Sequence, residues 1–78
     1  PNPFNPSTLI KYTLVQDAFV ELTVTDAMGR PVQRLVSEHQ KAGTYQLRFD
    51  AADKPSGLYI ATLRSGSSAT SIKMVLTR

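Results

Sequence analysis

Apolar and polar residues alternate with a period of two along most of this chain of 78 residues. In the first such run, Ile10, Tyr12 and Leu14 alternate with polar side chains. Three later runs repeat the pattern, at residues 19–26, 44–50 and 69–77. Because successive side chains of a strand point to opposite faces of a sheet, the alternation predicts β-strands with one face buried. The β-branched and aromatic residues in these runs suit such a surface.

Turn-forming residues separate the runs. Gly29 lies where a hairpin loop needs a positive φ, and Pro31 opens the next run at a position that tolerates its missing N–H. Further turns are predicted at 40–44 and 53–57, and a hairpin at 64–68. Six strands are expected, at residues 8–14, 19–26, 31–37, 44–50, 57–64 and 69–77. A seventh could come from splitting the third or from the entry segment. The expected fold class is all-β, an immunoglobulin-like β-sandwich of six to seven antiparallel strands.

Two segments depart from simple alternation. Residues 57–63, GLYIATL, are apolar on both faces and predict a central strand covered on both sides. The second segment has apolar residues and a histidine at the spacing of a helix face, at Val32, Leu35, Val36 and His39. This stretch is short, begins at a proline and lies between strands. We therefore favour a strand with a β-bulge.

Composition narrows the classes of function. The length allows at most one small domain, and the lack of cysteine excludes disulfides, thiolate nucleophiles and zinc fingers. The net charge is +3, but no two basic residues are adjacent, so we expect no nucleic-acid partner. A spanning helix needs about 20 apolar residues. The longest apolar run covers only 58–61, so no transmembrane segment is expected.

Candidate chemistry is sparse. The one histidine, His39, is interpreted as an exposed residue of a polar loop, and no serine lies in a nucleophile elbow. Asp26, Asp50 and Asp53 lie in predicted loops without the ligand spacing of a calcium loop. Asx turns explain these aspartates more simply. We therefore predict no catalytic residue, no metal and no cofactor, and we do not expect an enzyme.

Several motifs follow one another in a fixed order: PNPFNPST at the start, DAMGRPV at 26–32, AGTYQLRFDA at 42–51, PSGLYIATL at 55–63 and SIKMVLTR at 71–78. This ordered set resembles one known family, the C-terminal sorting domain of the type IX secretion system. The resemblance covers essentially the whole chain. It implies an immunoglobulin-like sandwich without catalysis that acts as an address for an N-terminally fused cargo.

The resemblance also implies partners and a route. The cargo is exported to the periplasm, and the outer-membrane translocon reads the domain. A sortase-like cysteine peptidase then usually removes the domain, leaving the cargo at the cell surface or secreted. A start at Pro1 rather than at a methionine fits a piece of a longer chain. We divide the chain into a Pro-rich entry segment or linker at 1–7, anchored by Phe4, and a sorting domain at 8–78.

The resemblance assigns roles to individual residues. The candidates for recognition by the translocon are Lys73, Met74, Val75, Leu76 and Arg78, the last standing where lysine is common. The other motif positions are Pro1, Asn2, Pro3, Asp26, Gly29, Arg30, Gly57 and Tyr59. Their structural interpretation is backbone geometry for the two glycines and core packing for Tyr59. Met74 and Leu76 should face the core, and Lys73 should point to solvent.

A second hypothesis stays open at this point. The chain could be a non-catalytic immunoglobulin-like spacer, adhesion or carbohydrate-binding module of an extracellular protein. Flagellar hook-capping proteins carry a similar sandwich and similar PNPFNP starts. The position of the domain in the full-length protein would separate the two hypotheses.

Overall fold

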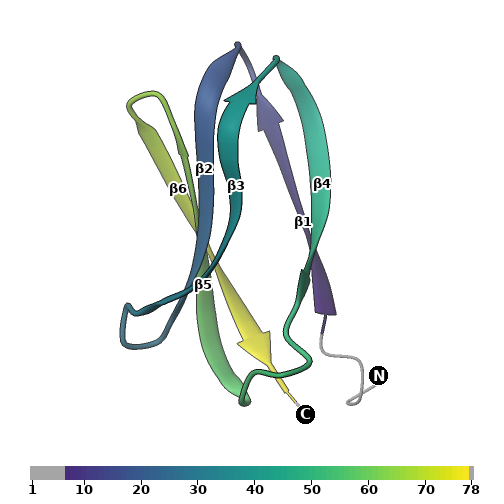
Figure 1. Cartoon of the computed structure of the whole chain (residues 1–78), viewed down its shortest axis with the longest axis vertical. Coiled ribbons are helices and arrows are strands. Elements are labelled where there is room, and N and C mark those ends of the chain that lie inside the picture. Colours follow the sequence, from purple (N-terminus) through teal and green to yellow (C-terminus); the bar gives the residue numbers. More distant parts are fainter. Residues whose placement is uncertain (1–6, 78) are drawn as a thin grey trace.

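The computed structural model describes residues 7–77, which form two antiparallel β-sheets and no helix (Figure 1). The strands are β1 (Ser7–Leu14), β2 (Ala18–Asp26), β3 (Pro31–Gln40), β4 (Gly43–Asp50), β5 (Gly57–Ser65) and β6 (Ser68–Leu76). One sheet has two strands in the order β1-β4, and the other has four in the order β3-β2-β5-β6. The all-β sandwich is confirmed. The predictions for Pro1, Asn2, Pro3, Phe4 and Arg78 lie outside the described residues.

The core lies between the two sheets, as the alternation of apolar and polar residues along the strands predicts. The buried apolar residues are Ile10, Tyr12, Leu14, Val20, Leu22, Val24, Phe49, Ala51, Tyr59 and Ala61. All but Ala51, which directly follows β4, come from the two sheets, and they form one cluster. Val20, Leu22 and Val24 of β2 are at most 1% exposed. Full burial of such a side chain contributes about 1.5–3 kcal/mol, so these three residues of β2 stabilise the fold substantially.

The segment 57–63 is a central strand, as expected, because β5 pairs with both β2 and β6. Its Tyr59 and Ala61 face the core, while Leu58 and Ile60 on the opposite face are only half-buried. The prediction of cover on both sides is therefore wrong. In the described part of the chain two layers form the fold, so no third layer covers the outer face of β5.

The ambiguous segment is a bulged strand, as favoured. In the β2–β3 pairing, Leu22 lies opposite Val36 and Thr23 opposite Arg34, so Leu35 is an extra residue. A second shift of register follows in the same pairing, after Val24. Each extra residue reverses which side chains face inward. The helix-like spacing of the apolar residues is thus the sequence signature of the bulges.

The third strand is three residues longer than predicted, and this changes the place of His39. His39 belongs to β3 and pairs with Phe19, with the two ring centroids 5.1 Å apart in an edge-on arrangement. The prediction of a loop histidine is wrong. The reason is tertiary, because the polar residues 37–40 extend β3 by pairing with the start of β2.

The chain crosses between the sheets twice at one end of the molecule. The β1–β2 and β3–β4 connections meet at the top of Figure 1. There the Oδ1 of Asp17 accepts a hydrogen bond from the Ala42 N–H at 2.8 Å, and the Tyr12 hydroxyl donates to Gln40 Oε1 at 2.6 Å. The start of β1 and the end of β6 lie together at the opposite end.

Candidate functional site

The β2–β3 hairpin contains the first family motif, Asp26-x-x-Gly29-Arg30. The Asp26 N–H donates to the Arg30 carbonyl, and the Gly29 N–H donates to the Asp26 carbonyl, both at 3.0 Å. This is a three-residue loop with a tight turn followed by a left-handed residue. Gly29 is that residue, with a φ of 82°. A side chain there would be strained even though the space around it is open.

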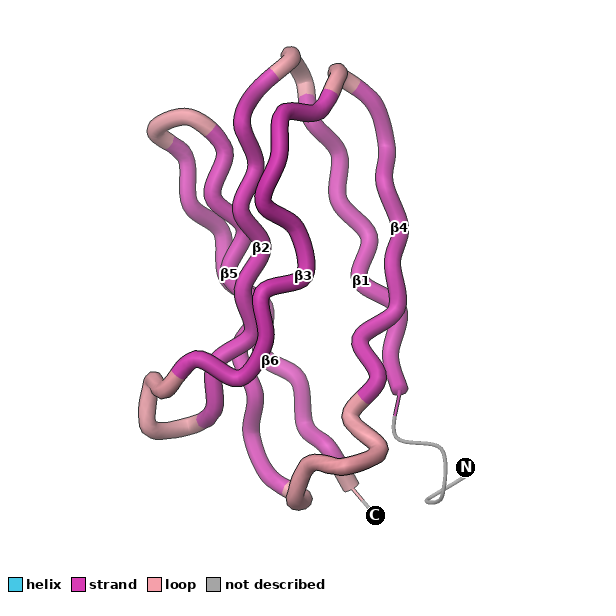
Figure 2. The backbone as a smooth tube through the Cα atoms, in the orientation of Figure 1, coloured by secondary structure: helices cyan, strands magenta, loops and turns pink. Residues whose placement is uncertain are grey.

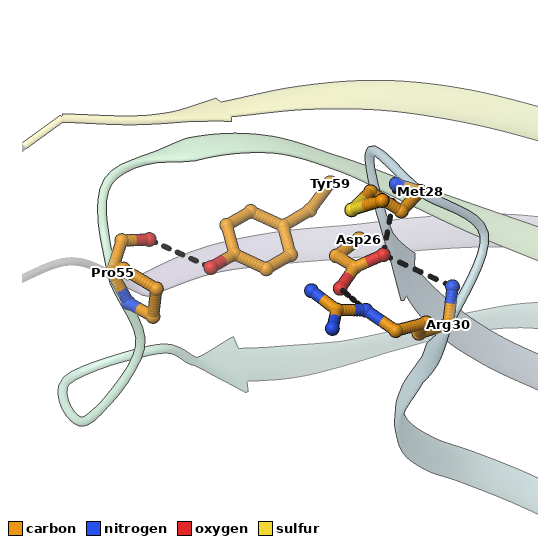
Figure 3. A network of polar contacts seen from close by, with 5 residues as sticks. All are labelled: Asp26, Met28, Arg30, Pro55 and Tyr59. Carbon is orange, nitrogen blue, oxygen red and sulfur yellow. Dashed lines mark hydrogen bonds and ion pairs between the residues drawn. The ribbon is translucent and has the colours of Figure 1, made fainter.

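The carboxylate of Asp26 stabilises the same loop (Figure 3). Its Oδ1 accepts hydrogen bonds from the Met28 N–H at 2.9 Å and the Arg30 N–H at 3.0 Å. Its Oδ2 accepts from Arg30 Nε at 2.9 Å. These bonds hold the pKa of Asp26 below its usual value, the backbone N–H of Arg30 contributing most. Asp26 forms the Asx turn that its sequence context indicated.

The second family motif, Gly57 and Tyr59, lies beside the first. Tyr59 is 4% exposed, and its ring centroid is 6.3 Å from that of Phe49. Its hydroxyl donates to the Pro55 carbonyl at 2.6 Å (Figure 3). Gly57 has a φ of 152°, which side-chain-bearing residues rarely adopt. These contacts agree with the structural interpretation of both residues.

The two motifs are neighbours in space, which sequence reasoning had missed. Asp26 and Tyr59 are partners in the pairing of β2 with β5. The β2–β3 loop and the β4–β5 loop both lie toward the end of the molecule where β6 finishes (Figure 2). Together they line a depression of about 370 Å³. Only the register of the two strands could have shown this proximity.

The third motif forms the last described strand, β6, which among residues 7–77 pairs with β5 alone and is therefore an edge strand. Met74 lies opposite Tyr59 in this pairing and Leu76 lies opposite Gly57; both side chains are half-buried against the core, as expected. Lys73 and Val75 alternate with them and lie on the outer face. Lys73 is exposed, and Val75 is 77% exposed.

A groove runs between β1 and β6 along the open flank of the sandwich. It has a volume of about 460 Å³ and is lined by residues 7–11 and 72–77, with Phe49, Ala51 and Tyr59 contributing from the core. A second hollow of about 250 Å³ continues it along residues 10–13 of β1. The groove exists because the smaller sheet has two strands and the larger has four. The groove could not have been predicted from the alternation of apolar and polar residues within individual strands.

A comparison with family models shows which family the chain belongs to. A model of the secretion system C-terminal sorting domain matches residues 1–77.

The chain belongs to this family.

No curated protein and no solved structure was found to match it. The sorting domain is a C-terminal signal for type IX secretion, and the hypothesis of a spacer or adhesion module is not favoured.

Membership of the family also sets the cellular context. The sorting domain belongs to the type IX secretion pathway and serves a cargo fused to its N-terminal side. Its pathway leads to the cell surface or to secretion. The family consists of sorting signals and is not known as catalytic.

The described part of the sorting domain offers little conventional site chemistry. Among residues 7–77 no cluster of histidine or carboxylate side chains is placed to hold a metal ion. The same residues contain no helix that is long and apolar enough to cross a membrane. They also contain no buried side-chain nitrogen or oxygen without a hydrogen-bond partner. The features with functional potential are therefore surfaces, namely the outer face of β6, the depression beside Asp26 and the groove beside β1.

Proposed function

We propose that the type IX outer-membrane translocon recognises the sorting domain through strand β6. Lys73 and Val75 make the contacts, Met74 and Leu76 hold the strand on the sandwich, and Arg78 extends the recognised segment. The proposal rests on one observation: inward-facing and outward-facing side chains alternate along β6, which lies at a sheet edge. Its inner side chains are tied to the core, while Lys73 and Val75 are presented to solvent.

The neighbours of β6 support this assignment. Val75 lies opposite Leu58 and Lys73 opposite Ile60 on the outer face of the larger sheet. Leu58 and Ile60 are half-buried, so Val75 extends a small apolar surface beside one positive charge. Apolar surface at the centre of a contact and charge at its rim is the usual anatomy of a protein interface. Recognition thus needs the folded strand and not only its sequence.

The rest of the pathway follows as part of the same proposal. The cargo reaches the periplasm, the translocon carries it across the outer membrane, and the sorting domain acts as an address without catalysis. A sortase-like cysteine peptidase removes the domain at or just upstream of the entry Pro1-Asn2-Pro3. The motif residues Asp26, Gly29, Arg30, Gly57 and Tyr59 act by maintaining the fold next to β6, and Pro1, Asn2 and Pro3 mark the junction with the cargo.

The test uses a reporter protein fused to the N-terminus of residues 1–78 in a bacterium with a type IX system. Lys73→Glu and Val75→Asp should retain the reporter in the periplasm, and surface labelling with fractionation measures this. Arg34→Glu is the matched control, because Arg34 is exposed on β3 at the opposite edge of the same sheet and the change in charge is identical to that of Lys73→Glu.

Circular dichroism of each purified variant checks that the fold is kept. Normal surface display of both β6 variants would refute the proposal. Equal retention of Arg34→Glu would also refute it, because delivery would then depend on net charge rather than on β6.

A further inference from the structure

We propose that the groove between β1 and β6 is a strand-addition site for an extended acidic segment of a partner protein. The segment pairs with the free edge of β1 as a third strand of the smaller sheet. Its apolar side chains, at alternate positions, enter the groove, and its acidic side chains lie on the outer face. This inference needs the fold alone and holds whether or not the translocon reads Lys73 and Val75.

The free edge of β1 is the first observation. β1 pairs with β4 on one side only, through eight residues without a shift of register. No described strand pairs with its other side, which presents backbone N–H and C=O groups over about 26 Å, at ~3.3 Å per residue. Proteins protect such edges with prolines and bulges. The edge strand β3 has both, in Pro31 and its two register shifts, while β1 has neither.

The uncovered inner face of β6 is the second observation. Ile72 and Met74 lie opposite Ala61 and Tyr59 and so point to the core side of the larger sheet. Ala61 and Tyr59 are buried, but Ile72 is 48% exposed and Met74 is half-buried. A strand added to β1 would lie about 4.8 Å from it and would cover this face at the usual spacing of about 10 Å between sheets. The groove is therefore the place of a missing strand.

The sign of the charge identifies the partner. The residues that line the groove and its continuation include no aspartate or glutamate. Lys11 of β1 is exposed on the outer face of the smaller sheet, where the acidic side chains of the added strand would lie, and it forms no ion pair with a described residue. Arg48 adds a second positive charge on β4, opposite Leu9. Opposite charges on adjacent strands attract and like charges repel, so an acidic strand fits and a second copy of this chain, with its net charge of +3, does not.

The probe is a capped seven-residue peptide of alternating glutamate and valine, titrated into the isotope-labelled chain. The length matches residues 7–13, which line the groove along β1. Amide chemical shifts should change at residues 8–13 and at 70–76, and cross-strand contacts should appear between the peptide and β1. A peptide of alternating lysine and valine should bind at least tenfold more weakly. Added salt should weaken the binding of the acidic peptide.

One pair of variants tests the groove itself. Ile72→Asp puts a carboxylate in the groove at a position that is already half exposed, and it should weaken peptide binding at least tenfold. Ser71→Asp adds the same group one residue away on the outer face, and it should change binding less than twofold. A dispersed amide spectrum verifies that both variants fold.

Three results would overturn the inference. One is a wild-type titration without shifts in β1 and β6, or with shifts at the β3 edge instead. The second is equal binding of the lysine and glutamate peptides. The third is a dimer of the free chain, seen by analytical ultracentrifugation, that Ile72→Asp dissociates. None of these results bears on delivery of the Lys73→Glu fusion, so the two proposals can fail separately.

Discussion

Tyr59 tests whether a family motif residue acts through the fold or through recognition. Tyr59→Phe keeps the ring against Phe49 and removes only the hydroxyl, which donates to the Pro55 carbonyl at 2.6 Å. The net contribution of such a hydrogen bond is about 0.5–1.5 kcal/mol. A domain of 78 residues has a total stability of roughly 4–12 kcal/mol, so this loss is measurable and not fatal.

Urea denaturation followed by circular dichroism measures the effect. With a slope of about 1 kcal/mol per molar urea, the midpoint should fall by about 1 M. Tyr45→Phe is the matched control, because that hydroxyl also donates to a carbonyl four residues earlier, Lys41, at 2.6 Å but in an exposed position. Its midpoint should fall by less. Tyr59→Ala also loses the ring and should cost about 3–5 kcal/mol.

Two results would contradict this reasoning. A Tyr59→Phe domain with the wild-type urea midpoint would show that the bond to Pro55 does not stabilise the fold. A variant of wild-type stability that fails to deliver a fused reporter would show that the hydroxyl is recognised directly. Reduced stability with normal delivery is the expected combination.

Three further predictions concern the hairpin and the core. Gly29→Ala should destabilise the domain by about 1 kcal/mol in thermal unfolding, because alanine is strained at a φ of 82°, and Gly29→Asn should cost less; equal melting of all three would refute this. Leu22→Ala should cost about 2–5 kcal/mol in urea, since Leu22 is 1% exposed in the middle of β2, and a loss below about 1 kcal/mol would mean that the core closes around the gap. Asp26 has a lowered pKa, so its contribution to stability is complete well above pH 3.8 and is lost as the pH falls through the folded-state pKa. Unfolding midpoints from pH 7 to pH 2 should therefore fall more steeply for the wild type than for Asp26→Asn, and parallel curves would argue against the role of this carboxylate.

The alternation of apolar and polar residues within each strand was enough to predict most of the fold. Ile10, Tyr12 and Leu14 are buried as their spacing indicated, and Gly29 has the positive φ that its loop required. Both follow from local rules, because side-chain direction in a strand and the φ of a turn depend on a few neighbouring residues. The predictions were wrong at positions whose structure depends on which other strand or layer lies beside them. His39 is in a strand because Phe19 lies opposite it, and Leu58 is half-buried because no layer covers it.

For the candidate site too, the sequence predicted features within one strand but not relations between distant strands. Sequence alone identified Lys73 as exposed and Met74 as facing the core, since these residues alternate in one strand. It did not place Asp26 beside Tyr59, nor β1 beside the uncovered Ile72, because those relations depend on strand order and register between distant segments.

The sequence by itself determined the strands, their buried faces, the turns and the family, since each is written in short-range patterns or in an ordered set of motifs. The tertiary structure decided which edges stay free and which faces stay open. A period-two pattern is satisfied by any sheet that buries one face, and it says nothing about which strand lies next. The division into a two-strand and a four-strand sheet depends on pairing between distant segments, and it leaves the flank between β1 and β6 open among the described residues.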